Sequence, residues 1–92
     1  MTDTNENSFT WNYRVVHNDT DSRYHWYSIH EVHYSGERII AYTEDPVGVA
    51  GETTEELFSE LNHMKDALSL PVLRLTELLT AIEEYNKSAP KP

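Results

Sequence analysis

Four histidines and several carboxylates lie in the first half of this chain, and these residue types can bind metal ions or transfer protons. Five histidines occur in 92 residues, and an imidazole both titrates near neutral pH and serves as a common metal ligand. His17, Glu31 and His33 form a polar cluster if the strands that carry them pair in register. The alternative function that we weigh is therefore a small metal- or ligand-binding enzyme that uses the strand histidines and Glu31.

The spacing of the polar residues argues against stronger chemistry. Successive side chains on a strand point to opposite faces, so His30 and His33 cannot share a metal without a bulge, and His30 and Glu31 cannot act on one atom. Ser28 lies near these histidines without a G-x-S-x-G nucleophile elbow, and the sequence has neither a P-loop nor a calcium loop. The chain has no cysteine, which excludes disulfides and thiolate sites. We predict a non-enzymatic protein without catalytic residues, metal or cofactor.

The negative charge is concentrated in one stretch. The formal net charge is −9, and no lysine or arginine occurs between Arg38 and Lys65. The acidic residues of this stretch are Glu44, Asp45, Glu52, Glu55, Glu56 and Glu60. Phosphate binding needs the opposite charge, so we expect no direct nucleic-acid binding, whereas an acidic surface can dock on a basic protein. The other interpretation is that these carboxylates aid solubility and favour a helix N-terminus.

Aromatic residues with polar edges are typical anchors of protein interfaces. Those that qualify are Trp11, Tyr24, Trp26, Tyr34 and Tyr42, although some of them can equally be core residues in so small a domain. The predicted partner-binding residues are Trp26, Tyr34, Tyr42, Glu44, Asp45, Glu55, Glu56 and Glu60. A chain of this length builds a small core, so we also expect a homodimer, which would bury a further face.

Three stretches rich in β-branched and aromatic residues predict strands. They are Trp11–His17, Tyr24–Tyr34 and Arg38–Glu44. Ser35-Gly36 predicts a tight hairpin, because glycine accepts the positive φ that such turns require. Pro46 ends the third strand, and an extended connector follows at Val47–Gly51.

Two helical patterns complete the chain. Thr53 and Glu56 form a capping-box pattern, with Thr54 as the other candidate cap, before a helix that extends to about Ser69. Its apolar residues recur at helical spacing, which predicts a core-facing stripe of Leu57, Phe58, Leu61, Met64 and Leu68. Pro71 ends this helix, and a second helix runs from Leu75 or Thr76 to about Asn86.

These elements predict an α+β fold: a three-stranded antiparallel sheet followed by two C-terminal helices packed on one face. The expected organisation is one domain at 9–87 between disordered tails at 1–8 and 88–92. The start of the chain lacks the pattern of a signal peptide, and no apolar run approaches the roughly 18 residues that span a bilayer. We therefore expect a cytoplasmic protein without membrane contact.

Two resemblances add to these expectations. The run Trp26–Tyr34, with the segments Ala41–Val47 and Gly51–Leu57, resembles a family of short bacterial proteins that carries a WYxIHEVxY strand motif and has no assigned function. This resemblance covers Tyr13 to Leu73. The order of three strands, an extended connector and a helix that opens at Gly51–Leu57 is similar, at the level of the fold, to the HicB antitoxin core. That similarity implies a domain that binds and blocks a small RNA-cleaving toxin, an antitoxin-like or inhibitor-like role.

Overall fold

The computed structural model describes residues 8–21, 23 and 26–88, and these form four strands, two α-helices and a short 3-10 helix, η2. In chain order they are β1 (Phe9–His17), β2 (Tyr27–Ser35), β3 (Arg38–Tyr42), α1 (Thr54–Asp66), η2 (Ala67–Ser69), β4 (Leu73–Arg74) and α2 (Leu75–Ser88). The α+β class is confirmed. The predicted start of the second strand at Tyr24 and most of the two predicted tails lie outside the described residues.

The sheet has four strands in the order β3-β2-β1-β4, so the prediction of three antiparallel strands was wrong. β1 and β2 pair antiparallel over their full length, from Phe9 opposite Ser35 to His17 opposite Tyr27. β4 pairs parallel with the end of β1 and makes the sheet mixed. The sequence pattern did not predict β4, because a strand of two residues between a proline and a helix is too short to show an alternation of apolar and polar side chains.

The hairpin predicted between the second and third strands is confirmed. Gly36 has φ of 60°, the left-handed conformation that glycine adopts without a steric penalty. The register shifts between His33 and Tyr34, so β3 carries a local irregularity opposite the end of β2.

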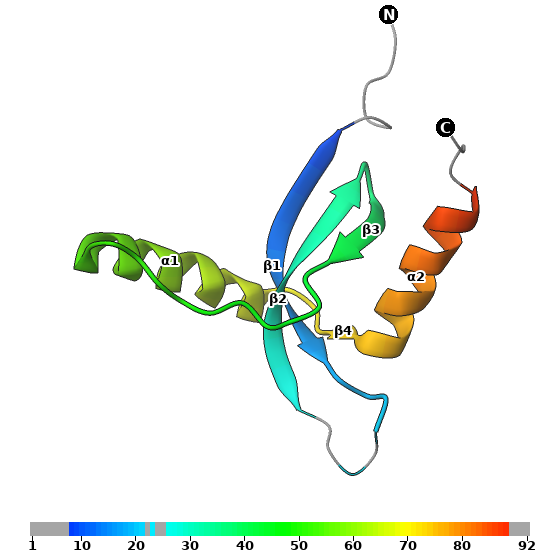
Figure 1. The fold of residues 1–92 in the computed structure, drawn as a ribbon, viewed down its shortest axis with the longest axis horizontal. Coiled ribbons are helices and arrows are strands. Elements are labelled where there is room, and N and C mark those ends of the chain that lie inside the picture. The colour runs from blue at the N-terminus through cyan, green and yellow to red at the C-terminus, as the bar shows by residue number, and fades with distance from the viewer. Residues whose placement is uncertain (1–7, 22, 24–25, 89–92) are drawn as a thin grey trace, which may run out of the picture.

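The two helices lie on opposite faces of the sheet, not on one face as predicted (Figure 1). Side chains alternate along β1, so Tyr13 and Val16 point to opposite faces. Leu78 of α2 packs with Val16 and Val32 in the core cluster, whereas Tyr13 contacts α1. The core cluster of Val16, Val32 and Leu78 therefore lies between α2 and one face of the sheet. α1 and η2 occupy the other face, where Ala67 is buried.

Local hydrogen bonds explain where α1 begins. The Thr53 hydroxyl accepts a hydrogen bond from the backbone N–H of Glu56 at 3.0 Å, which confirms Thr53 as the N-cap. The Glu56 carboxylate accepts from the backbone N–H of Glu52 at 2.9 Å, one residue further back than in a capping box. These bonds tie the end of the connector to the first turn of the helix.

The prediction that the apolar stripe of α1 faces the core was wrong, because no residue of α1 is buried. Phe58 is 67% exposed and Leu68 is 71% exposed. α1 projects from the sheet and meets it near its C-terminal end, where Ala67 of η2 is fully buried (Figure 1). The radius of gyration of 15.2 Å, against about 12 Å for a compact domain of this length, reflects this projection.

Candidate functional site

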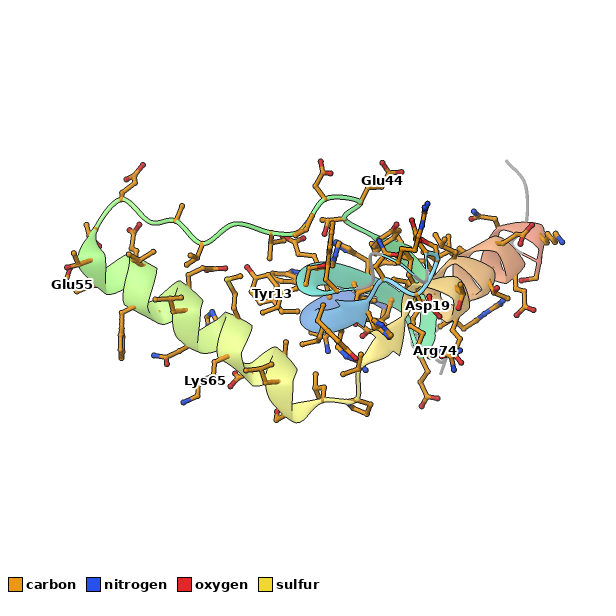
Figure 2. All side chains as sticks on the ribbon, turned by 90° about the horizontal axis from the view of Figure 1, so that it is seen from below. Tyr13, Asp19, Glu44, Glu55, Lys65 and Arg74 are labelled. Atoms are coloured by element: carbon orange, nitrogen blue, oxygen red, sulfur yellow. The ribbon has the colours of Figure 1, made fainter. Side chains whose placement is uncertain are left out.

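The connector and α1 together form an arm that carries the acidic stretch. In Figure 2 the connector runs beside α1, with Glu44 at its sheet end and Glu55 at the far end. The exposed carboxylates of this segment, here called the acidic edge, belong to Glu44, Asp45, Glu52, Glu55 and Glu56. Among the described residues, none of these five carboxylates forms an ion pair with a lysine or arginine. Lys65, the next basic residue, points away from the connector on the other side of α1 (Figure 2).

Two of the carboxylates predicted to bind a partner also stabilise the fold. Glu56 is bonded to the backbone of Glu52, as described above. Glu60 is half-buried and accepts a hydrogen bond from the hydroxyl of Tyr13. This bond to Glu60 is the main reason why the pKa of Tyr13 is raised to about 12, with burial as the next cause. The freest carboxylates of the predicted set are therefore those of Glu44, Asp45 and Glu55.

The three predicted aromatic anchors occupy different environments. Trp26 is 57% exposed. Tyr34 is half-buried; its hydroxyl accepts from Arg14 Nη1 at 3.0 Å and donates to Asn12 Oδ1 at 2.8 Å. Tyr42 packs against the core cluster, and burial, followed by the nearby Glu44 carboxylate, raises its pKa.

A cavity brings two of these aromatic residues together with the acidic edge. Its volume is about 160 Å³, and Trp26, Tyr42 and Glu44 all contribute to its lining. The other lining residues are Val16, Asn18, Ser28, His30, Pro46 and Leu75. One carboxylate beside two aromatic rings is an environment that attracts a cationic side chain.

The buried wall of this cavity contains a hydrogen-bonded chain that sequence reasoning missed. His30 is 5% exposed; its Nδ1 lies 2.7 Å from the carbonyl oxygen of Thr43, and its Nε2 lies 2.8 Å from Ser28 Oγ. Because a carbonyl only accepts, Nδ1 donates to it, and in the neutral ring Nε2 accepts from the Ser28 hydroxyl. The chain satisfies both nitrogens of a buried imidazole. The i, i+2 spacing of Ser28 and His30, which places both on one face of β2, was the available signal.

The predicted polar cluster is brought together only in part. His33 Nε2 lies 3.3 Å from Glu31 Oε1. His17 instead stacks on Tyr27, with ring centroids 4.5 Å apart. Tyr13 is the residue opposite Glu31, so His17 lies four positions, or about 13 Å, further along β1. Within the described residues, no group of three or more His, Cys, Asp or Glu side chains is arranged to hold a metal ion.

A second site that sequence reasoning missed joins the loop after β1 to the start of α2. Asp19 accepts hydrogen bonds from the Thr76 backbone N–H at 3.0 Å, the Thr76 hydroxyl at 2.7 Å and Arg74 Nε at 3.3 Å. The bonds from Thr76 are the largest cause of the lowered pKa of Asp19, about 2. Asp19 therefore caps a helix that begins more than fifty residues later, a pairing that no local sequence signal reveals.

Comparisons with known proteins do not add to this geometry. No protein-family model, curated protein or solved structure significantly matches the chain. Neither of the helices in the described part of the chain is both long and apolar enough to cross a membrane.

Proposed function

We propose that this chain is a non-enzymatic protein-binding module that recognises a basic protein through its acidic edge. The observation that carries the proposal is the cavity of about 160 Å³ in which Glu44 meets Trp26 and Tyr42. It unites the two kinds of residue that the sequence suggested separately, an interface aromatic and an acidic side chain.

The chemistry of this cavity favours an arginine or lysine of the partner. A guanidinium or ammonium group gains from the face of an aromatic ring as well as from a carboxylate. Asp45 and Glu55 extend the negative potential along the connector, which speeds the approach of a basic partner. An antitoxin-like or inhibitor-like role, in which this surface blocks a basic enzyme, is the most concrete form of the proposal. The order of three strands, connector and helix supports that form.

Charge reversal tests the proposal. We expect Glu44→Lys, Asp45→Lys and Glu55→Lys, combined in one variant, to abolish capture of a basic protein from the host's nuclease-treated lysate. These three carboxylates are chosen because Glu56 and Glu60 also stabilise the fold. A control variant with the same change in net charge carries Glu37→Lys, Glu83→Lys and Glu84→Lys, all at exposed positions outside the acidic edge.

The expected result is a basic protein, identified by mass spectrometry, that binds the wild type and the control but not the acidic-edge variant, and that is released as salt is raised. Equal capture by all three proteins would contradict the electrostatic proposal. Trp26→Ala should also weaken capture, because it removes one wall of the cavity.

The Glu31–His33 pair supports the alternative function, a metal- or ligand-binding enzyme. Stoichiometric metal in the purified protein, lost in a His33→Ala variant, would favour it over the protein-binding proposal.

A further inference from the structure

We propose that the cavity between β1 and α1 binds a small organic amine in its protonated form. The volume of this cavity is about 400 Å³, within the range of about 300–1,000 Å³ that is typical of small-molecule sites. Its lining residues are Trp11, Asn12 and Tyr13 of β1, Glu60, His63 and Asp66 of α1, and Leu70 after η2. It shares no lining residue with the cavity of Trp26, Tyr42 and Glu44, so this inference goes beyond the proposed function and can fail separately.

Two aromatic side chains form one wall of the cavity. Trp11 and Tyr13 are two residues apart on β1, so both point to the face of the sheet on which α1 lies. Their ring centroids are 5.1 Å apart and their planes are 80° apart. The Trp11 ring also stacks on His33 at 6.3 Å, and the Tyr13 hydroxyl is bonded to Glu60. Trp11 is nevertheless 50% exposed, so the contacts that fix its ring leave part of it open to a ligand.

A row of polar side chains on α1 forms the opposite wall. Glu60, His63 and Asp66 follow one another at intervals of three residues, which makes each the neighbour of the next on the helix surface. Neither carboxylate forms an ion pair with a lysine or arginine of the described chain, and no lysine or arginine lines the cavity. The two negative charges therefore have no cation of the described chain beside them.

The negative potential at this cavity also acts on Tyr13. The hydrogen bond to Glu60 and burial raise the pKa of Tyr13 most, and the charges of Glu60 and Glu31 raise it further. A field that disfavours a tyrosinate favours a cation at the same place. The formal net charge of −9 adds an attraction that acts at longer range.

These two walls match the chemistry of an organic amine. An ammonium group donates three hydrogen bonds, for which the carboxylates of Glu60 and Asp66 are charged acceptors, and it is attracted to the faces of aromatic rings. The rings and Leu70 offer apolar surface to the body of the ligand. A bare metal ion fits less well, because no group of three or more His, Cys, Asp or Glu side chains in the described part of the chain is arranged to hold one.

The two tryptophans of the chain make the test specific, because Trp11 lines this cavity and Trp26 lines the other. The probe is benzylamine, which is protonated at neutral pH, and benzyl alcohol is the uncharged compound of similar shape. We expect benzylamine to change the tryptophan fluorescence of the wild type and of Trp26→Phe saturably, but not that of Trp11→Phe. Benzyl alcohol should cause no saturable change.

A carboxylate variant tests the charge of the site. We expect Asp66→Asn to weaken the affinity for benzylamine by about tenfold, because a charge-assisted hydrogen bond is lost. The fold should be unchanged, since the Asp66 side chain makes no capping bond to η2. Glu37→Gln is the matched control: it removes one negative charge at an exposed position in the turn between β2 and β3 and should leave the affinity unchanged. Glu60 is not substituted, because it also holds Tyr13.

Several outcomes would overturn the proposal: no saturable response to benzylamine, an equal response to benzyl alcohol, or equal affinities of Asp66→Asn and Glu37→Gln. A response carried by Trp26 alone would place the amine in the other cavity. A lysine-rich peptide that changes Trp11 fluorescence where benzylamine does not would assign this cavity to a protein partner. If Asp66→Asn does not fold, the two tryptophan variants and benzyl alcohol still decide. None of these results changes the acidic-edge test, which depends on other residues and on capture of a protein.

Discussion

Single polar side chains hold together parts of this chain that are distant in sequence. Asp19 joins the loop after β1 to the start of α2, and Tyr13 joins β1 to α1 through Glu60. Both acidic groups were visible in the sequence, but their partners lie 57 and 47 residues away. Pairing over such distances depends on the tertiary fold, so residue types alone could not reveal it.

Asp19 makes the stability of the fold sensitive to acid. The pKa of Asp19 is lowered from 3.8 to about 2 in the folded chain, so its carboxylate stabilises the fold above about pH 4. This stability is lost as pH falls from about 4 through 2. We expect Asp19→Asn to lower the melting temperature at neutral pH and to flatten this acid-dependent loss, measured by thermal unfolding over a pH series.

Asp21→Asn is the control for that experiment, since within the part of the chain that the structure describes the Asp21 carboxylate bonds to nearby Arg23 alone. An Asp19→Asn variant whose melting temperature follows that of the wild type through the whole series would contradict the capping role.

Tyr13 makes the stability of the fold sensitive to alkaline pH. The raised pKa of Tyr13, about 12, means that its neutral hydroxyl stabilises the fold below about pH 10, and this stability is lost as pH rises from 10 through 12. We expect the tyrosinate absorbance titration to contain a component near 12 that Tyr13→Phe removes. Glu60→Gln should move this component toward 10, because the bond to Glu60 is the main cause of the shift.

Tyr27→Phe is the comparison variant, since Tyr27 is 61% exposed. If Tyr27→Phe removed the component near 12 and Tyr13→Phe left it in place, the proposed attachment of α1 to the sheet would lose its support.

Among the helices, strands and turns, the sequence predicted correctly those features that depend only on residues close together in the chain. The Thr53 cap, the turn at Gly36 and the helix end before Pro71 each follow from the chemistry of a few consecutive side chains. The two-residue β4 and the exposed stripe of α1 could not be predicted in this way. Periodicity shows that a helix has an apolar side, but not whether its own chain or another one covers it.

The two glycines of the connector differ in the space around them. A Cβ atom on Gly51 would lie 2.7 Å from the backbone nitrogen of Leu57, whereas one on Gly48 would have no atom within 4 Å. We expect Gly51→Ala to lower thermal stability and to speed hydrogen exchange in the first turn of α1, because backbone has to move. Gly48→Ala should be neutral, or stabilising by about 0.4–1 kcal/mol through the unfolded state. Equal behaviour of the two variants would mean that the connector is not packed against α1.

At the scale of the whole molecule, the fold class followed from the order of strands and helices, but the arrangement of layers did not. Placing both helices on one face assumed that the apolar sides of both helices pack on the same face of the sheet. The structure instead divides the molecule into a small core beneath α2 and an arm that carries two distinct surfaces, one acidic and one apolar. The sequence predicted Trp26, Tyr42 and Glu44 as residues of the candidate site, but it did not predict that they line the same cavity.

The strand order also affects how the protein is made. β1 lies inside the sheet, yet its second neighbour is β4, and Arg74 reaches its place beside His17 only after 57 further residues have been synthesised. At roughly 5–20 residues per second, this interval is roughly 3–11 seconds. During that time Val16 and His17, the two residues of β1 that pair with β4, have unpaired backbone groups on that side, which can pair with another chain. Until β4 has been synthesised, this edge of the nascent chain can pair with the strands of other nascent copies, made by adjacent ribosomes on the same messenger RNA.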